Sequence, residues 1–116
     1  MTDSLFRDLT LNEESTIERL LADDFPGRDQ IVEQLKGCSV RTIDENGSLE
    51  FQVVSPVKAT STKSRVPTEG EVEDSDGIVI HFLLHVVDET VKELEVYKED
   101  NSRVKTFPSP GAIRKS

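Results

Sequence analysis

The chain has 116 residues and carries 23 acidic against 14 basic residues, for a formal net charge of −9 at neutral pH. This length suits one domain, residues 1–116, and is too short for two. Phosphate backbones repel an acidic chain, so we expect no nucleic-acid partner. No apolar run approaches the roughly 20 residues that span a bilayer. The first residues do not resemble a signal peptide, so we expect a cytoplasmic protein with no membrane partner.

Two short helices are predicted near the N-terminus. Thr10 and Glu13 have the spacing of a capping box, which begins a helix over residues 11–22. A second helix is predicted over residues 28–36, because Gly37 is typical of a residue that follows a helix end. The apolar residues that repeat at helical spacing are Ile17, Leu20 and Leu21 in the first helix and Ile31, Val32 and Leu35 in the second.

A first hairpin is predicted from Cys38 onward, where the hydrophobic period changes to two. Its strands are expected over residues 38–45 and 48–54. Asn46-Gly47 favours a two-residue type I′ turn between them. That turn pairs Glu45 with Ser48, Thr42 with Phe51 and Val40 with Val53. The small polar residues 55–64 then predict a mobile loop.

Three further strands are predicted over residues 65–74, 78–87 and 91–99. Apolar residues occupy both faces of 78–87, which is therefore expected to be a central strand. Loops of three residues give the pairs Val72 with Ile80, Gly70 with Phe82, Leu84 with Leu94, Phe82 with Val96 and Val87 with Val91. The prolines after residue 103 predict an extended tail over 103–116.

These elements predict an α+β fold, with two N-terminal helices packed on one face of an antiparallel sheet of about five strands. The even-numbered residues of 78–87 would face the core, and the odd-numbered residues would form the other face. Residues 65–102 carry eleven acidic and three basic residues, which makes this odd face acidic. The predicted registers place His81 between Glu71 and Tyr97, and His85 opposite Glu93.

Other candidate sites have structural interpretations. His81 and His85 lie about 13 Å apart on a strand, so they cannot bind one metal ion together, and no metal site is expected. The Asp74-Ser75-Asp76-Gly77 segment lacks the later ligands of a calcium loop and predicts a hairpin turn. Cys38 is expected to be a buried structural thiol. No phosphate-binding loop, dinucleotide motif or serine elbow is present, so neither an enzyme nor a cofactor is expected.

The order of motifs along the chain is that of a known family. Its members resemble this chain at Leu9-Thr10 with Glu13, at Phe25-Pro26-Gly27-Arg28-Asp29 and at Asp44 to Phe51. The likeness continues through Val66-Pro67, Asp76-Gly77, His81 to Val87, Leu94-Glu95, Tyr97-Lys98 and Pro108. The chain thus resembles, over nearly its whole length, a family of small bacterial domains of unknown function. The resemblance implies a stand-alone α+β protein without assigned catalytic residues, similar at the level of fold to toxin-immunity proteins.

Two functions follow as hypotheses. The first is a non-catalytic binding protein, of immunity or regulatory type, whose acidic sheet face engages a basic protein partner or a second copy of the chain. The alternative is a small hydrolase or metal-dependent enzyme that uses His81 or His85 with a neighbouring carboxylate. The residues proposed to bind the partner are Glu69, Glu71, Glu73, His81, His85, Glu93, Glu95 and Tyr97.

Overall fold

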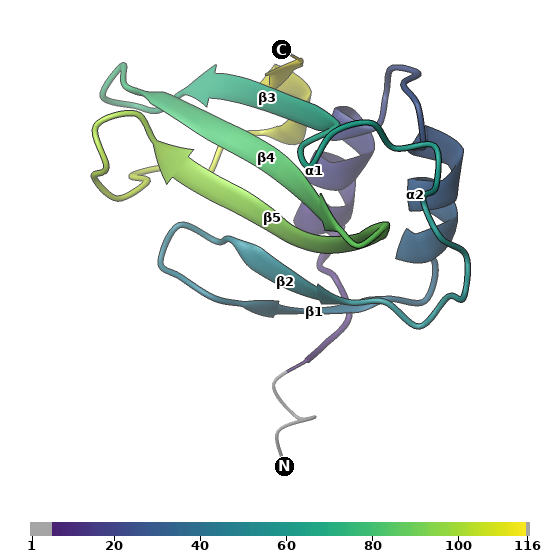
Figure 1. Cartoon of the computed structure of the whole chain (residues 1–116). Coiled ribbons are helices and arrows are strands. Elements are labelled where there is room, and N and C mark those ends of the chain that lie inside the picture. The colour runs from purple at the N-terminus through teal and green to yellow at the C-terminus, as the bar shows by residue number, and fades with distance from the viewer. Residues whose placement is uncertain (1–5, 116) are drawn as a thin grey trace.

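Two helices lie against one face of a six-stranded antiparallel sheet in the computed structural model, which describes residues 6–115 (Figure 1). The α+β fold is therefore confirmed, with one strand more than the expected five. The sheet order is β1-β2-β5-β4-β3-β6. The elements are α1 (Leu11–Leu20), α2 (Arg28–Leu35), β1 (Ser39–Thr42), β2 (Leu49–Gln52), β3 (Thr68–Glu73), β4 (Val79–Val87), β5 (Thr90–Lys98), the 3₁₀ helix η2 (Pro110–Ala112) and β6 (Arg114–Lys115).

The predicted capping box begins α1. The Thr10 hydroxyl accepts a hydrogen bond from the Glu13 amide at 3.1 Å, and the Glu13 carboxylate accepts one from the Thr10 amide at 2.9 Å. Arg7 adds a 2.8 Å ion pair to the same carboxylate. These contacts satisfy N–H groups that would otherwise lack partners at the helix start.

The predicted register of the first hairpin is wrong by two residues. Val40 pairs with Phe51 and Thr42 with Leu49, and a longer loop replaces the two-residue turn. The Asp44 carboxylate causes this, because it accepts hydrogen bonds from the amides of Asn46 and Ser48 at 2.9 and 3.0 Å. A shift of two residues preserves the side-chain alternation, so the apolar residues still face the core.

The β4–β5 hairpin follows the predicted register from His81 to His85 but not at its turn. Asp88 and Glu89 both adopt positive φ, 51° and 62°, in a two-residue turn. The register shifts by one residue between His85 and Val86, before this turn, so Val86 pairs with Val91 in place of the predicted pair of Val87 with Val91. The predicted β3–β4 register is confirmed, including Val72 with Ile80 and Gly70 with Phe82.

The core lies between the helices and the even-numbered side chains of β4. Phe82 is 5% exposed and Leu84 is fully buried. The expected loop at 55–64 contains no helix or strand, but Gln34 of α2 anchors it by donating a hydrogen bond to the Val57 carbonyl at 2.9 Å. Ala59 in this loop is fully buried and was not expected in the core. Among residues 6–115, no helix has the length and apolarity needed to cross a membrane.

The expectation of an extended tail over 103–116 is wrong for its last part. Residues 110–112 form η2 against α1, and β6 pairs with the outer edge of β3. Ile113 is fully buried between these elements. A Cβ atom at Gly70 would lie 2.8 Å from the Ile113 side chain, so the absence of a side chain at Gly70 allows this close approach.

Candidate functional site

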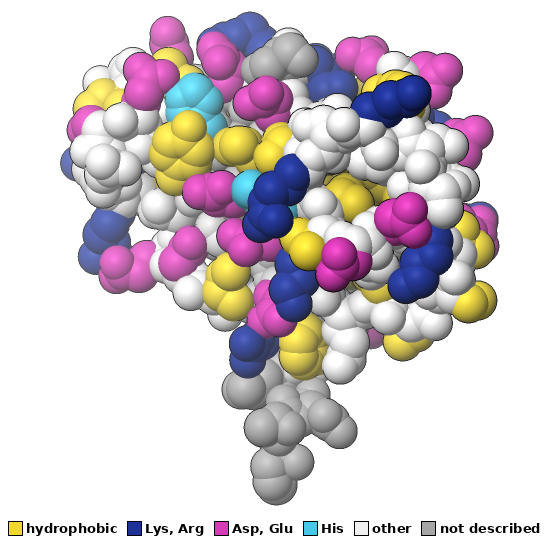
Figure 2. Space-filling model, in the orientation of Figure 1, with side chains coloured by type: hydrophobic (Ala, Val, Ile, Leu, Met, Phe, Trp, Pro, Cys, Tyr) yellow, Lys and Arg dark blue, Asp and Glu magenta, His cyan; other side chains and the backbone are white. Residues whose placement is uncertain are grey.

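One face of the sheet remains open because both helices cover the other. Along β4 the even-numbered residues are buried, and the odd-numbered residues are all of intermediate exposure. Figure 2 shows this open face, with acidic side chains around both histidines and hydrophobic side chains between them. Its apolar residues on β4 are Val79, Leu83 and Val87, and Tyr97 of β5 adds an aromatic ring.

The registers place seven glutamates on the open face. Five are the predicted ones on β3 and β5, and the structure adds Glu50 from β2 and Glu99 just beyond β5. Glu50 was missed because the pairing of β2 with β5 was not predicted. Glu99 was omitted from the predicted set, although it is an odd-numbered residue at the end of the predicted strand 91–99. The set is Glu50, Glu69, Glu71, Glu73, Glu93, Glu95 and Glu99.

Each histidine contacts a carboxylate diagonal to it on the sheet. Nε2 of His81 lies 2.8 Å from Glu99, and Nε2 of His85 lies 2.8 Å from Glu95. The residues directly opposite, Glu71 and Glu93, are at the predicted register positions but do not make these contacts. The histidine side chains are 19% and 15% exposed, so both are partly buried sheet residues with a carboxylate neighbour.

Aromatic and basic neighbours complete the histidine surroundings. The His81 and Tyr97 rings are stacked, with centroids 4.9 Å apart. Glu71, opposite His81 on β3, contacts Arg114 of β6 at 3.4 Å. Within residues 6–115, no three His, Cys, Asp or Glu side chains lie close enough together to hold a metal ion.

A second group of charges lies at the β1–β2–β5 end of the open face. Glu50 is directly opposite Glu93, an arrangement that is unfavourable for two like charges. Arg41 offsets it with a 2.6 Å contact to Glu50, and Lys92 lies 3.5 Å from the same carboxylate. The hydrogen bond from Arg41 lowers the pKa of Glu50 below its usual value. This end of the face is therefore closer to neutral than the β3–β4–β5 end.

The Asp74–Gly77 segment is a hairpin turn, as predicted, and its carboxylates bind a buried lysine. Lys98 is fully buried and lies 3.0 Å from Asp74 and 2.6 Å from Asp76. Burial alone would raise the pKa of Asp74. Hydrogen bonds from the amides of Lys105 and Thr106 and from Lys98 instead hold the pKa well below its usual value. These contacts attach the C-terminal segment to the β3–β4 turn.

Cys38 has the predicted character. It lies just before β1, its side chain is 7% exposed, and burial raises the pKa of its thiol. A raised pKa keeps a thiol protonated and unreactive at neutral pH.

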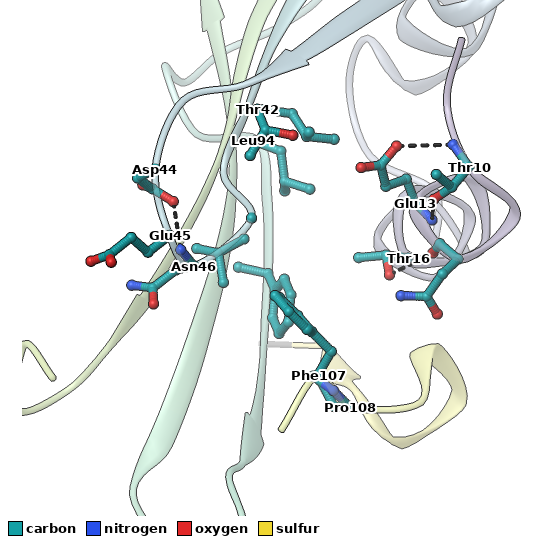
Figure 3. A pocket seen from close by; sticks show the side chains of 15 residues that line it. Thr10, Glu13, Thr16, Thr42, Asp44, Glu45, Asn46, Leu94, Phe107 and Pro108 are labelled. Atoms are coloured by element: carbon teal, nitrogen blue, oxygen red, sulfur yellow. Dashed lines mark hydrogen bonds between the residues drawn. The ribbon is translucent and has the colours of Figure 1, made fainter. Parts of the chain in front are cut away.

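The structure also contains a pocket that the sequence analysis did not predict. It has a volume of about 300 Å³ and lies between the N-terminal end of α1, the β1–β2 loop and the C-terminal segment (Figure 3). Its apolar floor consists of Leu49, Phe82, Leu94 and Val96. Thr10, Glu13 and Thr16 line one side, Asp44, Glu45 and Asn46 line the opposite side, and Phe107 and Pro108 close a third. Because these segments are distant in the sequence, no local motif indicates the pocket.

Comparison with known proteins identifies a family. The model of a domain of unknown function, DUF6984, matches residues 6–108, so the chain belongs to that family. No curated protein and no solved structure shows significant similarity to it.

Proposed function

We propose that this member of the DUF6984 family is a non-catalytic binding protein whose open sheet face engages a basic protein partner. One observation carries the proposal: seven glutamates gather on this face, and within residues 6–115 Arg41, Lys92 and Arg114 are the only Lys or Arg side chains in contact with them. An immunity or regulatory protein in the bacterial cytoplasm, which acts by covering another protein, would use such a surface. Complementary charge steers association and selects the partner.

The composition of the face supports protein binding in a second way. Leu83, Val79 and Tyr97 lie between the glutamates and are of intermediate exposure, so a partner could bury apolar area as well as pair charges. The C-terminal segment contacts this face through Arg114 at its β3 edge, since η2 and Ile113 pack toward α1. Within residues 6–115, no Lys or Arg pairs with Glu93 or Glu95 of β5, and Glu95 contacts only His85. These glutamates can therefore pair with a cation of an outside partner or of a second copy of the chain.

Capture from a cell lysate tests the proposal when paired with matched variants. Glu71→Lys with Glu95→Lys reverses two charges on the open face. Glu14→Lys with Glu18→Lys makes the same change on α1. We expect a basic protein that wild type and the α1 variant retain and the open-face variant loses, with binding that weakens steeply as salt is added. Equal capture by both variants, or capture indifferent to salt, would exclude this surface.

The enzyme alternative rests on the contacts between the histidines and glutamates. A carboxylate 2.8 Å from Nε2, as between Glu95 and His85, is a geometry also used to orient a histidine for proton transfer. However, neither histidine lines the pocket of Figure 3. A captured molecule distinguishes the two functions: a partner is recovered unchanged, whereas a substrate is altered by wild type and left intact by His85→Gln.

A further inference from the structure

The pocket of Figure 3 has the size and interior of a small-molecule site. Ligand pockets begin at about 300 Å³ and combine an apolar interior with a few polar groups. This pocket has that volume, and its floor side chains come from three strands, β2, β4 and β5. A ligand that fits it would have an apolar body of about one aromatic ring.

The charged residues on the pocket walls determine whether a cationic or an anionic ligand is favoured. All three charged residues that line it are acidic: Glu13, Asp44 and Glu45. Glu13 is neutralised by Arg7 at 2.8 Å, and Glu45 lies 3.3 Å from Arg103. Asp44 accepts hydrogen bonds from the backbone amides of its own loop and makes no ion pair with any described residue. Its charge therefore favours a cation and disfavours an anion in the pocket.

An exposed aromatic ring stands at the mouth of the pocket. Phe107 is 62% exposed, which is unusual for a phenylalanine side chain. A Cβ atom at Gly47 would lie 3.1 Å from this ring, so the glycine leaves the space in which the ring sits against the loop. Phe107 and Asp44 both line the pocket, and an aromatic face and a carboxylate each attract an ammonium group.

We propose that this pocket binds a small organic amine, with its ammonium group between Asp44 and Phe107 and its apolar body on the floor of Leu94 and Val96. This site is separate from the open face, since the floor residues belong to the opposite, helix-covered face of the sheet. Amine binding in the pocket and partner binding at the open face can therefore be tested independently of each other.

An NMR titration of the full chain tests the site with two probes of similar shape and opposite charge. The probes are 2-phenylethylamine and 3-phenylpropionate. We expect the amine to give saturable shifts centred on the amides of Gly47, Leu94, Val96 and Phe107, and the carboxylate to bind at least about tenfold more weakly. Equal or tighter binding of the carboxylate, shifts centred elsewhere, or no saturable shift would overturn the proposal.

Three variants assign the roles within the pocket. Asp44→Asn removes the charge and keeps the oxygen that accepts the loop hydrogen bonds, and we expect it to weaken amine binding about fivefold. Phe107→Ala should weaken it about two- to fivefold. Glu95→Gln on the open face is the matched control and should bind the amine as wild type does. If Asp44→Asn disturbs the loop, amine binding by wild type at rising salt provides the charge test, and it should weaken as salt is added. Unchanged affinity in Phe107→Ala, together with no loss of affinity in the charge test, would contradict the assignment.

Discussion

At the scale of single residues, the least expected feature is Lys98, a charged side chain on the core face of β5. Lys98 continues the alternation of Leu94 and Val96 along β5, so it lies on the same buried face as they do. The partners come from the β3–β4 turn, where Asp74 and Asp76 lie within 3.0 Å of its ammonium group. A buried charge is tolerated only when such partners satisfy it. The pairing could not be predicted because it depends on how the β3–β4 turn lies in space against the end of β5.

The pKa of Asp74 leads to a pH prediction for the Asp74→Asn variant. A carboxyl whose folded pKa lies below its unfolded value contributes stability that is present above the unfolded pKa and is lost as pH falls toward the folded pKa. We expect Asp74→Asn to be clearly less stable than wild type at pH 7 and this difference to shrink below about pH 4. Urea unfolding of both proteins at pH 7, 5 and 3 measures it. A difference that is constant with pH would mean that the Asp74 charge does not stabilise the fold.

At the scale of elements, side-chain alternation was predicted throughout, whereas turn geometry was predicted correctly only for the β3–β4 hairpin. The even face of β4 is buried as predicted, because burial depends only on a period of two. The two turn errors have local causes. The Asp44 carboxylate organises the longer β1–β2 loop, and Asp88 with Glu89 adopts a left-handed turn that sequence statistics assign mainly to glycine and asparagine.

One side chain of α2 connects three segments that the sequence does not relate. Gln34 is fully buried. Its amide nitrogen donates to the carbonyls of Val57 and Glu89 at 2.9 and 2.8 Å, and its oxygen accepts from the Val91 amide at 2.8 Å. It thus attaches the 55–64 loop and the β4–β5 turn to the helix. A glutamine on a short helix carries no sequence signal for this role.

Replacing this glutamine leaves buried backbone groups without partners. We expect Gln34→Ala to lower the free energy of unfolding by about 3 kcal/mol, because three hydrogen bonds are lost and the freed groups stay buried. Hydrogen exchange at the Val91 amide should accelerate more than at the strand centre. Gln30→Ala is the control, since Gln30 bonds to Thr60 and Ser61 at the exposed surface, and it should cost less than about 1 kcal/mol. Equal losses of unfolding free energy in the two variants would mean that Gln34 does not hold the loop and the turn against α2.

At the scale of the whole molecule, the sheet is covered on one face and open on the other. Two short helices and the C-terminal segment pack on the even face, and the odd face keeps its acidic and partly apolar surface (Figures 1 and 2). The sequence identified most of the open face, because adjacent residues of one strand point to opposite faces. Glu50 and the pocket were missed, since they depend on the order of strands and on the docking of the C-terminal segment. Glu99 was also missed, although its odd number in the predicted strand 91–99 places it on the open face.

Because one face of the sheet is covered and the other is open, replacing an aromatic residue by alanine should lower stability more on the covered face. Phe82→Ala removes a ring that is 5% exposed on the covered face, and it should cost about 3 to 5 kcal/mol. Tyr97→Ala on the open face should cost clearly less, because its ring stacks on His81 at a partly exposed position. Chemical denaturation of the two variants compares them. Near-wild-type stability in Phe82→Ala would mean that the even face is not the core.

The central claim is that the open sheet face is the surface that attracts a basic partner, and a titration with a basic peptide tests it most directly. Acidic residues also lie on α1 and α2, so the test must show where on the molecule the peptide binds. We predict that a ten-residue lysine peptide, added to the ¹⁵N-labelled chain at low ionic strength, shifts the amides of Glu71, His81, Glu95 and Tyr97 most. These shifts should disappear in about 0.5 M salt. Shifts centred on the helices, or shifts that persist in salt, would contradict the claim.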